Sequence, residues 1–112
     1  MEEASVSIRL NPFKGCAGPE GTPVPWSRHG RILDGRPSFT LDPLFHAGCY
    51  YVQDSSAMYV GHIFRRLMSD PAGGAGLRVL DLCAAPGGKT TDIAASCREL
   101  LGDDFLLVSN EV

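Results

Sequence analysis

A chain of 112 residues, 44% hydrophobic and 21% charged, has the length of one domain or parts of two and the composition of an ordinary globular protein. Its formal net charge of −3 argues against a protein that holds nucleic acid by bulk positive charge. The sequence lacks the ~18 consecutive apolar residues of a membrane span, and its acidic N-terminus, Met1–Ser5, is not a signal peptide. We therefore expect a cytoplasmic protein with no membrane partner.

The cysteines Cys16, Cys49, Cys83 and Cys97 show no C-x-x-C spacing, which argues against a metal site. Because no secretory signal precedes them, we expect free thiols and not disulfides.

The first 40 residues predict short strands and loops. Val6–Leu10 alternates polar and apolar residues, as a half-buried strand does. The glycines and prolines between Phe13 and Pro25 predict a loop. Two short strands, at 24–26 and 30–33, are expected around a turn at residues 27–30.

Four side chains in this region could either contact RNA or have a role within the protein or at its surface. Trp26 either stacks on an RNA base or, as the preferred interpretation, covers a small core. Arg28, Arg31 and Arg36 either contact phosphate or form a solvated rim, and the sequence does not decide between the two.

A second unit is expected to begin after a linker at residues 42–48, in which we take His46 to be structural. Tyr50–Val52 predicts an extended segment, and Asp54 is the expected N-cap of a following helix. A stripe of apolar residues at helical spacing predicts the buried face of this helix: Val60, Ile63, Phe64 and Leu67. Asp70–Pro71 is expected to stop the helix before a surface loop at Gly73–Gly76.

The central stretch runs from Val79 to Thr90. Val79–Leu82 is an apolar run that predicts a buried parallel strand, and the glycines after it predict a tight turn into a helix that Gly102 ends. Ile93, Cys97, Leu100 and Leu101 are the expected buried face of that helix. Phe105–Val108 predicts a second parallel strand, so strand, helix and strand form a crossover.

The turn has alternatives when only its glycines are considered. Gly87-Gly88-Lys89-Thr90 imitates the end of a phosphate-binding P-loop, but Cys83 stands where that motif has its first glycine. A small nucleotide- or phosphate-binding module and a plain strand-to-helix turn without a ligand therefore remain alternatives.

The whole string Asp81-Leu82-Cys83-Ala84-Ala85-Pro86-Gly87-Gly88-Lys89-Thr90 resembles the cofactor motif of the Nop/Sun family of RNA cytosine-5 methyltransferases. Three further segments resemble the same family: Ser7–Asn11 its early substrate-domain strand, Tyr51–Met58 the helix start before the motif, and Ser109–Glu111 the end of its second strand.

The resemblance implies an α/β fold: the first βαβ part of a Rossmann-like methyltransferase domain, preceded by a small, shortened α+β substrate-binding segment. Residues 1–45 would be a partial RNA-binding segment, and residues 46–112 the start of the domain that binds S-adenosyl-L-methionine. The substrate would be RNA, with ribosomal RNA favoured over transfer RNA.

The resemblance also assigns a cofactor site: Cys83, Ala84, Ala85, Pro86, Gly87, Gly88, Lys89 and Glu111. Cys83–Lys89 would wrap the methionine end of the cofactor, and Glu111 would accept hydrogen bonds from the ribose, although a loop acid without a ligand is the alternative. Asp81 would either orient the loop or face the cofactor's ammonium group. Lys89 would either pair with the cofactor carboxylate or be solvated.

No catalytic residue is expected in these 112 residues. Methylation at cytosine C5 needs an activated cysteine, and the family's two catalytic cysteines follow the second strand in segments that this sequence does not contain. We therefore expect the fragment alone to be inactive. A non-enzymatic interaction protein that has kept the fold is the third alternative.

Overall fold

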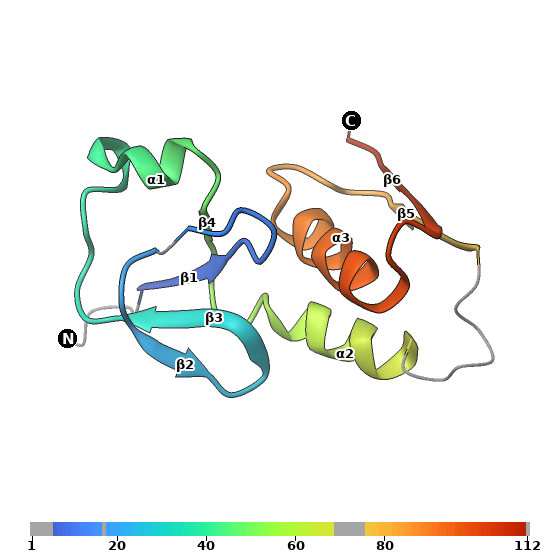
Figure 1. Ribbon diagram of the computed structural model, residues 1–112, viewed down its shortest axis with the longest axis horizontal. Helices are drawn as coiled ribbons and strands as arrows, with labels where there is room; N and C mark the ends of the chain where they lie inside the picture. The colour runs from blue at the N-terminus through green and yellow to red at the C-terminus, as the bar shows by residue number, and fades with distance from the viewer. Residues whose placement is uncertain (1–5, 17, 69–75, 112) are drawn as a thin grey trace. The chain divides into compact units, whose positions relative to one another are not determined.

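The computed structural model describes residues 6–16, 18–68 and 76–111. The chain forms two compact units, Met1–Tyr59 and Val60–Val112. The elements in chain order are β1 (Val6–Leu10), β2 (Thr22–Val24), β3 (Ser27–Leu33), the 3-10 helix η1 (Phe39–Leu41), α1 (Pro43–His46), β4 (Tyr50–Val52), α2 (Tyr59–Met68), β5 (Leu77–Asp81), α3 (Gly88–Leu101) and β6 (Phe105–Ser109) (Figure 1).

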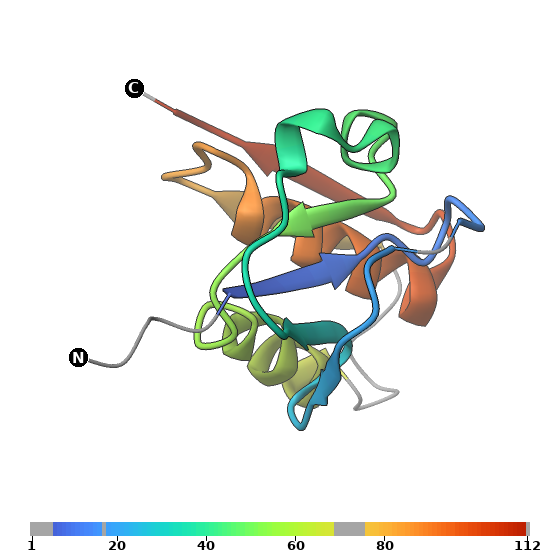
Figure 2. The same ribbon diagram turned by 90° about the vertical axis from the view of Figure 1, so that its left-hand side faces the viewer.

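The first unit is built on an antiparallel sheet with the strand order β2-β3-β1-β4. Its central strand, β1, was predicted correctly: Ile8 pairs with Arg31 of β3 on one side and with Val52 of β4 on the other. Figure 2 shows β1 between these two neighbours. Ser7, Ile8 and Arg9 are all buried, so the central strand is covered on both faces and is not half-buried as expected.

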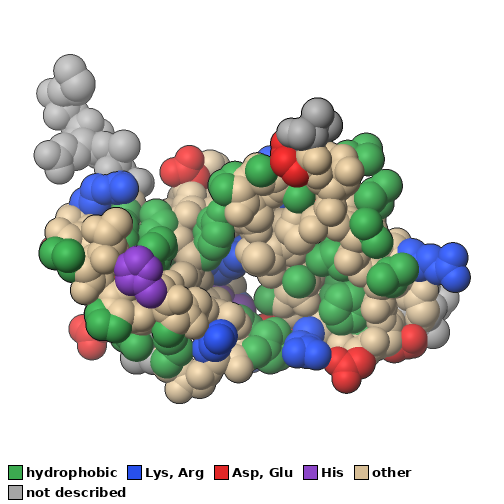
Figure 3. Space-filling model, turned by 90° about the horizontal axis from the view of Figure 1, so that it is seen from above, with side chains coloured by type: hydrophobic (Ala, Val, Ile, Leu, Met, Phe, Trp, Pro, Cys, Tyr) green, Lys and Arg blue, Asp and Glu red, His purple; other side chains and the backbone are tan. Residues whose placement is uncertain are grey.

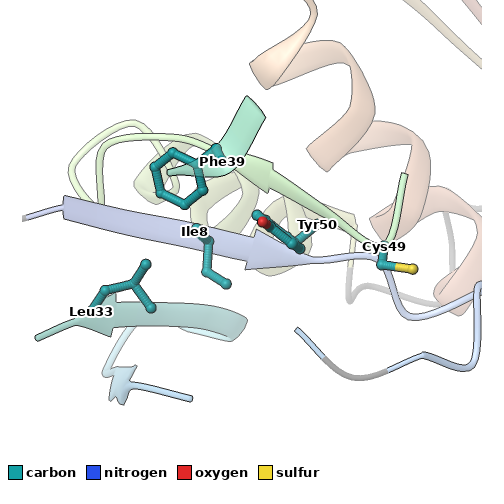
Figure 4. Close-up of a cluster of buried hydrophobic side chains, with 5 residues drawn as sticks. All are labelled: Ile8, Leu33, Phe39, Cys49 and Tyr50. Carbon is teal, nitrogen blue, oxygen red and sulfur yellow. The ribbon is translucent and has the colours of Figure 1, made fainter. Parts of the chain in front are cut away.

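The core of this unit gathers apolar side chains from four parts of the chain: Ile8, Leu33, Phe39, Cys49 and Tyr50 (Figure 4). Ile8 is fully buried at their centre. The rings of Phe39 and Phe45 lie 6.0 and 5.9 Å from the ring of Tyr50, within the distance range of interacting aromatic pairs. The short helices η1 and α1 thus close the core beside β4.

Two boundaries in the first unit differ from the sequence-based expectation. The chain turns at Pro25–Trp26 and not at residues 27–30, because β2 begins at Thr22, inside the expected loop. Pro23 is tolerated there because β2 is an edge strand, where a missing N–H is not needed for pairing.

The expected linker at 42–48 contains α1, whose first turn is capped by Asp42 through a 2.9 Å bond from the Leu44 N–H to Oδ1. Asp54 is not a helix N-cap, since α2 begins only at Tyr59 after a turn in which the Ala57 N–H donates to the Asp54 carbonyl.

The expectation of free thiols is wrong for two cysteines. Cys16 and Cys49 form a disulfide that joins the loop after β1 to the residue before β4. The Asn11 N–H donates to the Cys49 carbonyl at 2.8 Å, so the same two segments are also joined by a backbone hydrogen bond. Sequence spacing gave no sign of this pairing, because the two cysteines approach each other only when β1 and β4 pair.

The second unit contains the predicted strand, helix and parallel strand. β5 and β6 pair in parallel from Leu77 with Phe105 to Asp81 with Ser109, and α3 between them ends at Gly102 in a positive-φ conformation, as expected. The expectation of buried strands is wrong, because every residue of β5 and β6 is half-buried or exposed. On one face, large side chains are exposed: Leu80 by 59%, Leu106 by 55% and Val108 by 47%.

The predicted apolar stripe of α2 is not its buried face. Ile63 and Leu67 are 47% and 66% exposed, and Gly61 is the only residue of the helix that is buried. Gly61 instead packs against Asp92 of α3, and Arg65 donates to Ser96 at 3.0 Å and pairs with Glu99 at 2.7 Å. The contacts of Arg65 with α3 are polar, and hydrophobic periodicity alone does not predict them.

The buried face of α3 was predicted only in part. Cys97 is fully buried, but Leu100 is 42% exposed, and the other buried residues of the helix are Asp92 and Ser96. The expected helix stop at Asp70–Pro71 and residues 73–75 of the expected glycine loop lie outside the described residues.

The compact units divide later in the chain than the two functional segments that the sequence suggests. Residues 50–52 pair with β1, so they belong to the first unit although the expected boundary lies after residue 45. That functional boundary stays a prediction.

Candidate functional site

The loop at residues 82–87 lies at the carboxyl end of the parallel sheet. β5 ends at Asp81, α3 begins at Gly88, and Asn110 and Glu111 directly follow β6. Because the two strands are parallel and in register at Asp81 and Ser109, the loop and the end of β6 meet at the same edge. Two segments more than 20 residues apart in sequence therefore form one structural feature.

Three consecutive amides of the loop are held by the protein itself. The Cys83 N–H donates to Oδ1 of Asp81 at 3.2 Å, and the Ala84 N–H donates to the carbonyl of Asn110 at 2.8 Å. The Ala85 N–H donates to Oε2 of Glu111 at 2.9 Å. Each amide thus has an acceptor before any ligand arrives.

Asn110 makes two further bonds to the start of the loop. Its backbone N–H donates to the Asp81 carbonyl at 2.7 Å, and its side-chain Nδ2 donates to the Leu82 carbonyl at 3.1 Å. Together with the bond from Ala84, Asn110 contacts three successive parts of the same turn. Asn110 lies in the segment Ser109–Glu111 that resembles the family, but the sequence assigned it no role of its own.

Asp81 joins the loop to the first turn of α3. While Oδ1 accepts from Cys83, Oδ2 accepts from the Thr90 hydroxyl at 2.5 Å. Of the two roles considered for Asp81, the orienting role is the one that the structure contains. Thr90 was present in the motif but had been given no role.

Gly87 closes the loop in a backbone conformation that L side chains rarely adopt. Its φ is 110°, it occupies the N-cap position of α3, and no side chain caps the helix there. A Cβ at this position would meet no atom within 4 Å, so backbone conformation and not space requires the glycine. The peptide bond between Ala85 and Pro86 is cis.

The predicted site residues lie together, since Cys83–Lys89 form one loop and first helical turn, and Glu111 is bonded to Ala85. Lys89 is exposed on that first turn. Whether these residues bind a cofactor stays a prediction. The carboxylates of Asp81 and Glu111 both accept hydrogen bonds from the loop, so negative charge is concentrated beside its backbone.

The cysteines differ in accessibility. Cys83 is an exposed free thiol, whereas Cys97 is buried, and burial raises the pKa of the Cys97 thiol above its ordinary value. A raised pKa means less of the nucleophilic thiolate. Cys16 and Cys49 are joined to each other.

In the first unit, Trp26 makes contacts within the protein, but it is not part of the core cluster, so its expected role of covering a core stays a prediction. Its Nε1 donates to the Ser55 carbonyl at 2.7 Å, and its ring lies edge-on to Tyr59, 5.9 Å between centroids. Arg31 donates to the Arg28 and Gly30 carbonyls at 3.1 and 2.7 Å. The guanidinium of Arg36 lies 5.5 Å from the centroid of the Phe39 ring.

His46 contacts the Thr40 carbonyl at 2.8 Å through Nε2, as a structural residue would. In the described ranges 6–16, 18–68 and 76–111, no three His, Cys, Asp or Glu residues are grouped so that they could hold a metal ion. Within the same part of the chain, no helix combines the length and apolar character needed to cross a membrane.

Comparisons with known proteins give similarity along almost the whole chain. Residues 1–55 match a family model described as the N-terminal domain of 16S rRNA methyltransferase RsmF. A ribosomal RNA small subunit methyltransferase F from Vibrio cholerae serotype O1 is 39% identical over 96 residues, which are 80% of this chain and 18% of that protein. The protein of the same name from Escherichia coli O127:H6 is 39% identical over 120 residues, covering 94% of this chain and 23% of that protein.

A solved structure resembles the fold as well. The crystal structure of a methyltransferase homolog protein from Pyrococcus horikoshii has a TM-score of 0.70 and 28% identity, covering 96% of this chain and 35% of that one. The present chain spans about a fifth of the length of the curated relatives that it matches.

Proposed function

The chain belongs to the Nop/Sun family of RNA methyltransferases, and from this premise we propose that its second unit binds the methyl donor S-adenosyl-L-methionine. Cys83–Lys89 would hold the methionine end, and Glu111 the ribose. The unit would then be the first βαβ part of a Rossmann-like domain, and residues 1–45 part of the segment that contacts RNA. The donor would supply the methyl group.

The observation that carries the proposal is that backbone N–H groups of the loop already bind acceptors within the protein. A phosphate cradle offers successive backbone N–H groups to an anion. Here the N–H groups of Cys83, Ala84 and Ala85 already donate to Asp81, Asn110 and Glu111. A phosphate would therefore not find these three amides free, so a phosphate-binding module would have to use Gly87–Thr90, which the titration with ATP tests.

Charge at the site favours S-adenosyl-L-methionine over a polyphosphate ligand. Two carboxylates, Asp81 and Glu111, accept bonds from the loop, and a nearby carboxylate repels a polyphosphate and attracts a cation. S-adenosyl-L-methionine carries a sulfonium and an ammonium group. Glu111 uses Oε2 for the Ala85 N–H, so Oε1 is the oxygen we assign to the ribose hydroxyls.

The substrate that we propose is small-subunit ribosomal RNA, methylated at cytosine C5. The relatives are named for the small subunit, and the matching family model for 16S rRNA. In this chemistry a cysteine thiolate adds to C6 of the base, which makes C5 nucleophilic toward the methyl group. We accordingly propose action in the cytoplasm, where bacterial ribosomal RNA is modified.

We assign that thiolate to a part of the enzyme outside these 112 residues, so the fragment alone would be inactive. Cys97 is buried, Cys16 and Cys49 are paired, and Cys83 lies in the cofactor loop. Arg28, Arg31 and Arg36 remain candidates for phosphate contacts. The bonds of Arg31 use one of its guanidinium nitrogens, and the contact of Arg36 with Phe39 is with the ring face and uses no N–H donor.

The test is calorimetric titration of the chain with S-adenosyl-L-methionine and, separately, with ATP. We expect heat with the methyl donor alone and its loss in Gly87→Val, because φ 110° at this position disfavours valine. Gly35→Val is the matched control: Gly35 has φ 90° and open space, but lies in the first unit. It should lose a similar amount of stability and keep the binding.

Two results would contradict the proposal. Heat with ATP alone would support a phosphate-binding module. Equal loss of binding in both glycine variants would mean that general destabilisation, and not the cofactor loop, explains the effect.

A further inference from the structure

We propose that Asn110 is a positioning residue that holds the loop at residues 82–87 in its binding shape before the cofactor arrives; this inference rests on the proposed function. Asn110 does not touch the cofactor in this proposal. It acts through the loop backbone, and its side chain is the part that a substitution can test.

The contacts of Asn110 make it the link between β6 and the loop. Its backbone bonds, to the Asp81 carbonyl at 2.7 Å and from the Ala84 N–H at 2.8 Å, continue the pairing of β5 and β6 beyond Ser109. The side-chain bond from Nδ2 to the Leu82 carbonyl, at 3.1 Å, extends this connection across the turn. All three bonds lie on the side of the loop that begins at β5.

The other side of the loop is held by Thr90, through its 2.5 Å bond to Asp81. Asp81 therefore connects the two sides, since its carbonyl accepts from Asn110 and its carboxylate from Cys83 and Thr90. A loop fixed in this way loses less conformational freedom when a ligand binds, which strengthens binding without any added contact.

Asn110 also affects Glu111, the residue assigned to the ribose. The Ala84 N–H bonds to Asn110 and the adjacent Ala85 N–H bonds to Glu111, so displacement of the turn would move the donor that orients the Glu111 carboxylate. Loop shape and carboxylate orientation are thus coupled through two consecutive amides.

The test compares Asn110→Asp with Asn11→Asp in the full chain. The two asparagines are matched, because Asn11 Nδ2 also donates to a carbonyl at 3.1 Å, that of Gly48 in the first unit. In each variant a carboxylate oxygen replaces the amide donor and faces a carbonyl. Affinity for S-adenosyl-L-methionine is measured by calorimetry, and amide hydrogen exchange by NMR.

We expect Asn110→Asp to weaken binding about tenfold, the scale of one lost hydrogen bond whose acceptor, the Leu82 carbonyl oxygen, then faces a carboxylate. Exchange should accelerate at Cys83, Ala84 and Ala85, while amides in the middle of α3 keep their protection. Asn11→Asp should leave both quantities unchanged. Thr90→Val, which removes the bond to Asp81 with little change in volume, should produce a smaller loss of the same kind.

Unchanged loop exchange in Asn110→Asp would overturn the inference, as would acceleration spread evenly over the second unit, which a merely structural role would produce. If Asn110→Asp does not fold, Asn110→Ser, which removes the Nδ2 donor without adding a charge, decides by the same two measurements. Absence of binding by the unsubstituted chain would count against the proposed function itself, whereas the exchange rates would still decide whether Asn110 holds the loop.

Discussion

The two units of the chain keep their apolar side chains in different environments. In the first unit, β1 lies between two antiparallel neighbours, and Ile8 and Tyr50 are almost completely buried. In the second, no residue of the two-stranded parallel sheet is buried. Hydrophobic side chains reach the surface of the molecule (Figure 3), and in the second unit these include residues of the sheet itself: Leu80, Leu106 and Val108.

The difference follows from how strands and helices cover a sheet. Antiparallel strands joined by short loops can close a core within a few dozen residues, whereas parallel sheets are normally covered by helices on both faces. The loop at residues 82–87 therefore depends on hydrogen bonds and not on burial for its shape. Three predictions test this contrast, from the largest expected effect to the smallest.

The largest effect is expected from truncating a side chain in each unit. Ile8→Ala should lower the free energy of unfolding by about 3 kcal/mol, because a fully buried isoleucine leaves a cavity. Leu106→Ala, at a side chain that is 55% exposed, should cost only about 0.5 kcal/mol. Urea denaturation measures both: the fluorescence of the single tryptophan, Trp26, reports on the first unit, and circular dichroism reports on the helix α3 of the second unit. Equal losses would refute the contrast.

A smaller effect is expected where α2 meets α3. In an exposed helix, Gly→Ala is stabilising by about 1 kcal/mol. At Gly61 an added Cβ would overlap the Asp92 carboxylate, so we expect Gly61→Ala to destabilise the chain by about 2 kcal/mol. Thermal unfolding measures the change. Combining it with Asp92→Ala should cost less than the sum of the two single variants, and a stabilised Gly61→Ala would disprove the close packing.

The smallest effect is expected from the pH dependence of folding stability that Tyr50 causes in the core of the first unit. Burial, followed by the 2.6 Å hydrogen bond from the Tyr50 hydroxyl to Asp42, raises the pKa of Tyr50 to about 12. The folded state therefore holds this proton more tightly than the unfolded state. The resulting stability is complete below about pH 10, the ordinary tyrosine pKa, and is lost as pH rises toward 12.

The melting temperature of the unsubstituted chain and of Tyr50→Phe, measured from pH 9 to pH 12, isolates this contribution. Their difference should shrink above about pH 10, because the phenylalanine variant has no hydroxyl to ionise. Parallel curves over the whole range would contradict the prediction.

Patterns within short stretches of sequence correctly predicted several helices and strands, because these elements form from residues that are close together in the chain. The strand at Val6–Leu10, the glycine after α3 and the order of β5, α3 and β6 all follow from alternation, helix-ending chemistry and apolar runs. The motif likewise predicted which residues form the loop. Its family resemblance is confirmed by the comparisons.

Contacts between distant segments could not be predicted in this way. The pairing of Cys16 with Cys49 depends on β1 meeting β4, and the exposure of Ile63 and Leu67 depends on Arg65 and Gly61 facing α3. The start of α2 at Tyr59 also escaped prediction, although Asp54 has the chemistry of an N-cap. In the first two cases the contacting partner is far along the chain, whereas residues 54–59 form local turns before α2 begins.

The sequence by itself thus determined the family, the strand–loop–helix order of the motif and the residues of the candidate site, because these depend on short-range chemistry. Only the tertiary structure decided how the loop is held. Asn110 and Glu111 reach it because parallel pairing brings the carboxyl ends of β5 and β6 to one edge. Hydrogen bonds across that edge join residues more than 20 positions apart, a distance over which periodicity and motif spacing carry no information.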